Sequence, residues 1–150
     1  MTLTVEIVTA ERVVRIEAGV DALIVPGSEG QLTILPRHAA LMTTLDAGEL
    51  IFRRAGEEHS FAVSGGFMEV NHDRVTVLAD RAEAADEIDV TRAEAARARA
   101  EDLLRRAREQ NARDVDTIRA QAALQRALVR IRVSQRRRRP VSTGTRPIGQ

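Results

Sequence analysis

The chain has 150 residues, a net charge of +1 and no cysteine, and its only aromatic residues are three phenylalanines. This length fits one medium-sized domain or two small ones, and the lack of cysteine excludes a disulfide framework, a thiolate nucleophile and zinc-finger spacing. No apolar run approaches the roughly 20 residues that span a bilayer. The N-terminus also lacks the pattern of a signal peptide. We therefore expect a cytosolic protein that reaches a membrane only through a partner.

Residues 1–84 carry the signals of short β-strands. Leu3, Val5 and Ile7 alternate with polar residues, which is typical of a half-buried strand. Further short apolar segments follow at regular spacing. Turns that contain Gly, Pro or Asn separate them, and we place these turns at 26–30, 47–48, 55–58 and 71–74. This arrangement predicts an N-terminal antiparallel β-sandwich over about residues 1–84, interrupted at 64–66 by a bulge or a close backbone contact.

From residue 89 the pattern has the period of a helix, and Gly and Pro are absent from 76 to 139. Asp89 or Thr91 can cap the first helix, since Thr91 and Glu94 have the spacing of a capping box. An interruption at 111–114 separates two helical segments, which predicts a C-terminal antiparallel α-helical hairpin over 85–135. The expected apolar stripes consist of Val90, Ala93, Ala96, Ala100, Leu103, Leu104 and Ala107, and of Val115, Ile118, Ala122, Leu124, Leu128 and Ile131.

The apolar seam of this hairpin is rich in alanine. Alanine buries little area, at about 0.8 kcal/mol per methylene, so we expect a marginally stable hairpin that can open or dock elsewhere. Residues 136–150 contain Arg136 to Arg139, Pro140 and Gly144. This composition predicts a basic, disordered tail, either solvated or in contact with anionic lipid or an acidic protein.

Catalytic motifs are sparse. His38, His59 and His72 lie in or beside turns without metal-ligand spacing. Ser64-Gly65-Gly66 lacks the glycine that precedes the serine of a nucleophile elbow, and there is no Walker A motif. The Gly-rich segment 27–31 is either a plain turn or a protein-contact loop.

Arginine provides the sharper signal, because all 23 basic residues are Arg. Arg92 and Arg99 share a face of the first helix, and Arg119, Arg126 and Arg130 share a face of the second. An antiparallel hairpin can bring the two sets together. They form either a solvated face balanced by nearby acidic residues, or a site for an anion such as a polyphosphate or an acidic partner helix.

Several motifs then resemble one known family, over about residues 3–133. They are Pro26-Gly-Ser-Glu-Gly30, Leu35-Pro-x-His38, Leu45-x-x-Gly48, Val63-Ser-Gly-Gly-Phe67, Glu69-Val70, Val75-Thr-Val-Leu-Ala-Asp80 and Ala82-Glu83. In this order and at these intervals they resemble the epsilon subunit of bacterial rotary, proton-translocating ATP synthases. Arg37 and Ala40 depart from the Gly and Pro that the family often has around the loop histidine.

The resemblance implies a non-catalytic subunit of the central stalk, at the cytoplasmic face of the cell membrane and peripheral to it. Its sandwich would bind the gamma subunit and the c-ring, and its hairpin would extend toward the α/β catalytic head and inhibit ATP hydrolysis. Nucleic acid is not an expected partner. The contact loops implied for gamma and the c-ring contain Ser28, Glu29, Gln31 and His38.

Some family members bind ATP on the folded hairpin through an Ile/Leu-Asp-x-x-Arg-Ala motif, which Ile88 to Ala93 resemble. No cofactor is required, and ATP would be a regulatory ligand without hydrolysis. The residues implied for it are Glu83, Ile88, Asp89, Arg92, Ala93, Arg99, Arg126 and Arg130. The alternative is a free-standing ATP-sensing regulatory protein, with no affinity for gamma.

Overall fold

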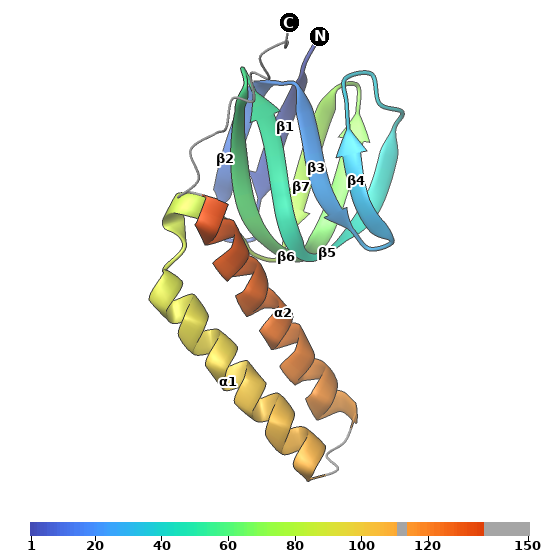
Figure 1. The fold of residues 1–150 in the computed structure, drawn as a ribbon. Helices are drawn as coiled ribbons and strands as arrows, with labels where there is room; N and C mark the ends of the chain where they lie inside the picture. The colour runs from blue at the N-terminus through green and yellow to red at the C-terminus, as the bar shows by residue number, and fades with distance from the viewer. Residues whose placement is uncertain (111–113, 137–150) are drawn as a thin grey trace, which may run out of the picture.

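The computed structural model describes residues 1–110 and 114–136, which form a β-sandwich followed by a helical hairpin (Figure 1). The strands are β1 (Leu3–Val8), β2 (Val13–Val20), β3 (Ala22–Gly27), β4 (Gly30–Ile34), β5 (Leu41–Arg54), β6 (Glu57–Asn71), β7 (Arg74–Ala79) and β8 (Ala82–Ala84). A 3-10 turn η1 (Ala85–Glu87) leads into α1 (Val90–Glu109) and α2 (Asp114–Arg136). The predicted fold class is confirmed. The predicted tail lies outside the described residues from 137 onward, and Arg136 belongs to α2.

The strands form one continuous sheet in the order β2-β1-β7-β6-β5-β3-β4, with β8 added to β6. The pairing of β1 with β7 is parallel, and the other pairings are antiparallel. The sheet encloses a core of Val, Leu, Ile, Met and Phe, in which Leu3, Val5 and Ile7 are buried as their alternation predicts. Phe52 is fully buried in it.

The expected turn at Ala47-Gly48 is wrong, because β5 runs unbroken through both residues and pairs with β6. The glycine has a packing role instead. A Cβ on Gly48 would lie 2.5 Å from the Cβ of Pro26 on β3. Gly48 therefore leaves room for the proline of the neighbouring strand. A glycine needed for close packing inside a strand looks the same in the sequence as a glycine in a turn, which is why the prediction was wrong.

The turn at 71–74 is confirmed between β6 and β7. Its central residues His72 and Asp73 both have positive φ, of 49° and 58°, as a two-residue type I′ hairpin requires. The anticipated interruption at 64–66 lies inside β6, where Gly65 and Gly66 have positive φ. It is a place of close backbone contact, since a Cβ on Gly66 would lie 2.1 Å from the carbonyl oxygen of Leu78.

Helix α1 begins after Asp89, whose side chain accepts a hydrogen bond from the backbone N–H of Arg92 at 3.1 Å. Asp89 is therefore the N-cap. The alternative cap, Thr91, lies inside the first turn. The face of α1 that packs on α2 buries Ala93, Ala100, Leu104 and Ala107, whereas Leu103, expected in the same stripe, is exposed.

Helix α2 has two buried faces, and the single stripe predicted for it is wrong. Ala120 and Ala127 are buried on one side, and Val129 and Val133 on another. Val115, Ile118 and Leu128, all expected to be buried, are exposed. The reason is that α2 lies between α1 and the sandwich, so its apolar residues follow two stripes.

The hairpin rests on the sandwich through α2, which packs on β5, β6 and η1, while α1 packs mainly on α2 (Figure 1). The apolar contact is a small cluster of Ala62, Ile88, Ala93, Val129 and Val133. Gln125 adds a hydrogen bond from its Nε2 to the carbonyl oxygen of Ala47, at 3.2 Å. The far end of the hairpin projects beyond the sandwich (Figure 1).

Candidate functional site: an arginine-lined cleft between sandwich and hairpin

A cleft of about 610 Å³ lies where the sandwich, α1 and α2 meet. Its size is within the range of small-molecule sites. The sandwich contributes the β1–β2 turn, part of β6 and the β7–β8 turn, and the helices contribute Arg92, Ala96 and the segment from Ala123 to Arg130. Both domains therefore face the same space, and a ligand there would touch both.

One arginine of the cleft is already paired. Arg130 donates from Nε to Oε2 of Glu83 at 2.6 Å and from Nη2 to Oε1 at 3.1 Å. Both side chains are about one-third exposed. This two-point ion pair joins α2 to strand β8, in which Glu83 is the central residue. In this structure Arg130 and Glu83 hold the domains together.

Three other cleft arginines lack such a partner. Arg81, Arg92 and Arg126 line the cleft, and none of them has an ion pair with any side chain that the structure describes. Arg12 is paired loosely, with Nη2 at 3.2 Å from Oε2 of Glu87. Guanidinium groups facing a shared space are an anion-binding arrangement.

The remaining residues of the 88–93 motif position the arginines. Ile88 and Ala93 are buried at 3% and 0% exposure, in the cluster between hairpin and sandwich. Asp89 caps α1 and so fixes its first turn. None of these three lines the cleft, whereas Arg92 does. The motif thus places Arg92 through packing and capping.

The expected convergence of five arginines is wrong for Arg99 and Arg119, which are exposed and do not line the cleft. Each lies seven residues from a cleft arginine, Arg92 or Arg126. Seven residues correspond to nearly two turns and about 10 Å along the axis. Sharing a helix face therefore did not bring these side chains to one point.

Arg12 and Arg81 were missed by the sequence reasoning. Both belong to turns of the sandwich, and their distance in sequence from the helical arginines gave no periodic signal. The only local sign was a basic residue in each turn. Tertiary packing of the hairpin against these turns creates the site.

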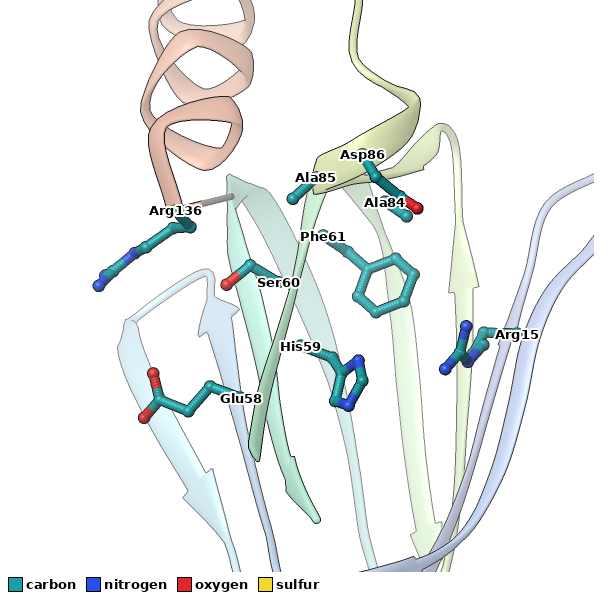
Figure 2. A pocket seen from close by; sticks show the side chains of 9 residues that line it. All are labelled: Arg15, Glu58, His59, Ser60, Phe61, Ala84, Ala85, Asp86 and Arg136. Atoms are coloured by element: carbon teal, nitrogen blue, oxygen red, sulfur yellow. The ribbon is translucent and has the colours of Figure 1, made fainter. Parts of the chain in front are cut away.

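A second, smaller pocket of about 360 Å³ lies at the end of α2 (Figure 2). Arg15 and Arg136 stand on different sides of it, and His59 stacks on Phe52 with ring centroids 4.7 Å apart. Arg15 bonds Glu17 at 2.9 Å, and Arg136 bonds Glu49. Because both arginines are engaged, this pocket is the weaker anion site.

The residues expected in contact loops lie at the two ends of β4. Ser28, Glu29 and Gln31 are exposed around the β3–β4 turn, where the Ser28 and Thr44 hydroxyls lie 2.5 Å apart. His38 is half-buried in the loop after β4, and its Nδ1 lies 2.7 Å from the carbonyl oxygen of Ala39. These residues offer two separate contact surfaces.

The sandwich also exposes an apolar stripe, which runs over one face of five adjacent strands. Phe67 and Leu78 are direct cross-strand partners and are 56% and 54% exposed. The stripe consists of the exposed Met42, Phe67, Leu78, Val13 and Ile16, with the half-buried Val8 between Leu78 and Val13. Contiguous exposed apolar side chains of this kind mark a protein-binding surface.

Residues 1–110 and 114–136 contain neither a cluster of metal-ligating side chains nor a helix that could cross a bilayer. No group of three or more His, Asp or Glu side chains in that part is arranged to hold a metal ion. None of its helices has the length and apolar character needed to cross a bilayer.

Together the fold, the cleft and the stripe define a two-domain protein, in which a β-sandwich carries a helical hairpin. Residues 2–85 match the model of the ATP synthase delta/epsilon chain β-sandwich domain, and residues 86–135 that of its long α-helix domain. The chain belongs to the ATP synthase delta/epsilon chain family.

Individual relatives agree with this assignment. An ATP synthase epsilon chain from Herpetosiphon aurantiacus is 51% identical over 138 residues, or 92% of this chain and 98% of the relative. One from Dehalococcoides mccartyi is 49% identical over 137 residues, or 91% of this chain and 95% of the relative. A chain in the Euglena gracilis mitochondrial ATP synthase OSCP/F1/c-ring structure shares the fold, with a TM-score of 0.72 at 20% identity, over 92% of this chain and 82% of that chain.

Proposed function

We propose that this chain is the epsilon subunit in the central stalk of an F-type, proton-translocating ATP synthase, and that it is a non-catalytic part of the rotor. Relatives of about half-identical sequence over nearly their whole length support this role. In the complex the sandwich binds the gamma subunit and the c-ring, so that the chain lies peripherally at the cytoplasmic face of the membrane. The hairpin faces the α/β catalytic head when it extends.

The gamma subunit binds the apolar stripe of the sandwich. The stripe carries five apolar side chains that are each more than half exposed, Met42, Phe67, Leu78, Val13 and Ile16. Covering them would stabilise a complex at roughly 25 cal/mol per Å². A pull-down tests this assignment: purified gamma is captured with the full chain, with the Phe67→Ser and Leu78→Ser variants, and with Leu103→Ser as the control. Leu103 is equally exposed but belongs to α1. Equal retention of gamma by all four proteins would contradict the assignment.

The hairpin inhibits ATP hydrolysis by leaving the sandwich. The observation that carries this step is the small contact between the two, an apolar cluster of five buried residues supplemented by a few polar contacts, most of them from α2. Few buried contacts correspond to a low free energy of local opening. Once released, the arginines of the hairpin can pair with acidic surface on the catalytic head.

ATP is the regulatory ligand of the folded hairpin, bound in the arginine-lined cleft. Arg92 and Arg126 contact its phosphates, Glu83 and Arg130 fix the wall beside it, and no hydrolysis follows. A ligand shifts the equilibrium between the folded and the released hairpin only if it binds one of these two forms better than the other. Arg99 lies outside the cleft in this folded form, so its implied contact with ATP requires another arrangement of the hairpin.

One experiment separates the roles of the two domains. The assembled enzyme is prepared with the full chain or with a chain that ends after residue 87, and both gamma retention and ATP hydrolysis are measured. We expect the shortened chain to remain in the complex and hydrolysis to rise. Loss of the shortened chain from the complex, or unchanged hydrolysis, would contradict the proposal. In the full chain, Arg126→Ala should weaken ATP binding far more than gamma binding.

A further inference from the structure

We propose that two arginines of the sandwich, Arg81 and Arg12, complete the anion site of the cleft together with Arg92 and Arg126 of the hairpin. A polyphosphate chain held there ties the hairpin to the sandwich directly. The inference rests on the proposed regulatory binding of ATP, and it adds residues, a ligand class and a physical cause for the coupling.

Arg81 is held in place by a well-fixed backbone. It lies in the β7–β8 turn between Ala79 and Ala82, which are 5% and 6% exposed. Its carbonyl oxygen accepts a hydrogen bond from the backbone N–H of Ser64 at 3.0 Å. Its exposed side chain lines the cleft and has no ion pair with a described side chain. Because its backbone is fixed and its guanidinium has no ion-pair partner among the described side chains, Arg81 is the residue of the sandwich best placed to bind an anion in the cleft.

Arg12 lies in a turn that is closed by its own hydrogen bonds. The backbone N–H of Thr9 donates to the carbonyl oxygen of Arg12 at 2.9 Å, and the backbone N–H of Arg12 donates to Oγ1 of Thr9 at 3.3 Å. Its guanidinium uses a single N–H for Glu87. A guanidinium has five N–H donors, so Arg12 can bind an anion without leaving Glu87.

The charge of the cleft fits a polyanion. Its lining holds five arginines and three carboxylates, an excess of two positive charges. One arginine and one carboxylate, Arg130 and Glu83, neutralise each other, and Arg12 is paired with Glu87 outside the lining. Arg81, Arg92 and Arg126 then stand against two carboxylates, Glu11 and Asp80. No aromatic side chain lines the cleft, so a base has no stacking partner there. Recognition is therefore directed at the phosphate chain, which defines the ligand class as a polyphosphate, nucleotide or inorganic.

Contact with both domains explains how such a ligand acts. In the released hairpin the cleft no longer exists, because its two walls have separated. A ligand that needs both walls stabilises the folded form by RT ln(1 + [L]/Kd), about 2.7 kcal/mol at a concentration of 100 Kd. A ligand held by the hairpin alone would bind both forms and would shift nothing.

The test measures binding of ATP and of inorganic tripolyphosphate to the full chain by calorimetry. Arg81→Gln and Arg12→Gln are compared with the wild type and with Arg92→Gln. Arg108→Gln is the matched control, because Arg108 is exposed on α1 outside the cleft. Thermal melts show that each variant is folded. We expect Arg81→Gln to weaken binding of both ligands about tenfold, Arg12→Gln several-fold, and Arg108→Gln less than twofold.

The outcomes separate the two proposals. If Arg92→Gln loses ATP while Arg81→Gln and Arg12→Gln bind as the wild type does, the two sandwich arginines take no part in binding; this inference then fails, and the proposed ATP site with Arg92 stands. If the wild type binds neither ligand, the regulatory ATP site fails as well. Binding of ATP without tripolyphosphate overturns recognition through the phosphate chain. Hydrogen exchange adds a readout, since ATP should slow exchange in α2 of the wild type and less so in Arg81→Gln.

Discussion

Arg136, in the last turn of α2, clasps Glu49 on β5 with two hydrogen bonds. Its Nη2 donates to Oε1 at 2.8 Å and its Nε to Oε2 at 3.2 Å. The side chain of Glu49 is only 9% exposed, and hydrogen bonding to it raises the pKa of Arg136. This pair fastens the end of the hairpin to the sandwich.

Glu49→Gln should loosen that end. Hydrogen bonds between charged groups contribute about 1.5–3 kcal/mol, so amide exchange in the last two turns of α2 should become at least several-fold faster, as measured by mass spectrometry. Arg132→Ala is the control, because Arg132 is exposed on the same helix and has no ion pair with a described side chain. The same acceleration in both variants would show that Arg136 does not fasten the helix through Glu49.

The alanine seam between α1 and α2 sets their close approach. Ala127 is 2% exposed, and Ala127→Leu would force the helices apart at a cost of about 1–3 kcal/mol. We expect faster exchange over 90–136 and unchanged exchange over 1–84. Ala98→Leu, at an exposed position of α1, should have no such effect. Slower exchange in Ala127→Leu would mean that the seam has unfilled space.

Gly66 tests the close backbone contact between the paired strands β6 and β7. Its φ is +121°, and an added Cβ would lie 2.1 Å from the carbonyl oxygen of Leu78. Gly30 has a similar φ of +127° with nothing within 4 Å of its Cβ position. Gly30→Ala should therefore cost about 1–3 kcal/mol through the backbone alone, and Gly66→Ala should cost more. Urea denaturation measures both, and equal losses would remove the close contact as a cause.

Glu17 makes the sandwich sensitive to acid. Burial disfavours its charged form, but hydrogen bonds and positive charge from Arg15 and Arg54 outweigh burial, so its pKa lies below the usual value. The stabilisation is therefore full above the unfolded pKa, about 4.3 for glutamate, and is lost as pH falls through the folded value. Glu17→Gln should be less stable than the wild type at pH 7, with a gap that narrows below about pH 4. A gap of constant size from pH 7 to pH 3 would contradict the role of this carboxylate.

Local sequence patterns predicted the elements well where the structure of a segment depends only on residues close to it in sequence. The alternation of Leu3, Val5 and Ile7 places β1, and positive-φ turn residues place the hairpin at 71–74, because both depend on neighbours in sequence. The prediction of a turn was wrong at Gly48, because this glycine makes room for Pro26 on the neighbouring strand. The prediction of a single apolar stripe was also wrong for α2, where Val115 and Ile118 are exposed, since periodicity alone does not show that a helix has two packing partners.

The sequence by itself determined that a β-sandwich precedes a helical hairpin, that Asp89 or Thr91 caps α1, and that the arginines of each helix share a face. Those properties follow from periodicity and from contacts within a few residues. Only the tertiary structure decided that Arg130 is held by Glu83, that Arg99 lies apart, and that Arg81 and Arg12 join the cleft. The physical reason is that α2 docks across turns distant in sequence, and the position of that docking, rather than any local spacing, selects which guanidiniums meet.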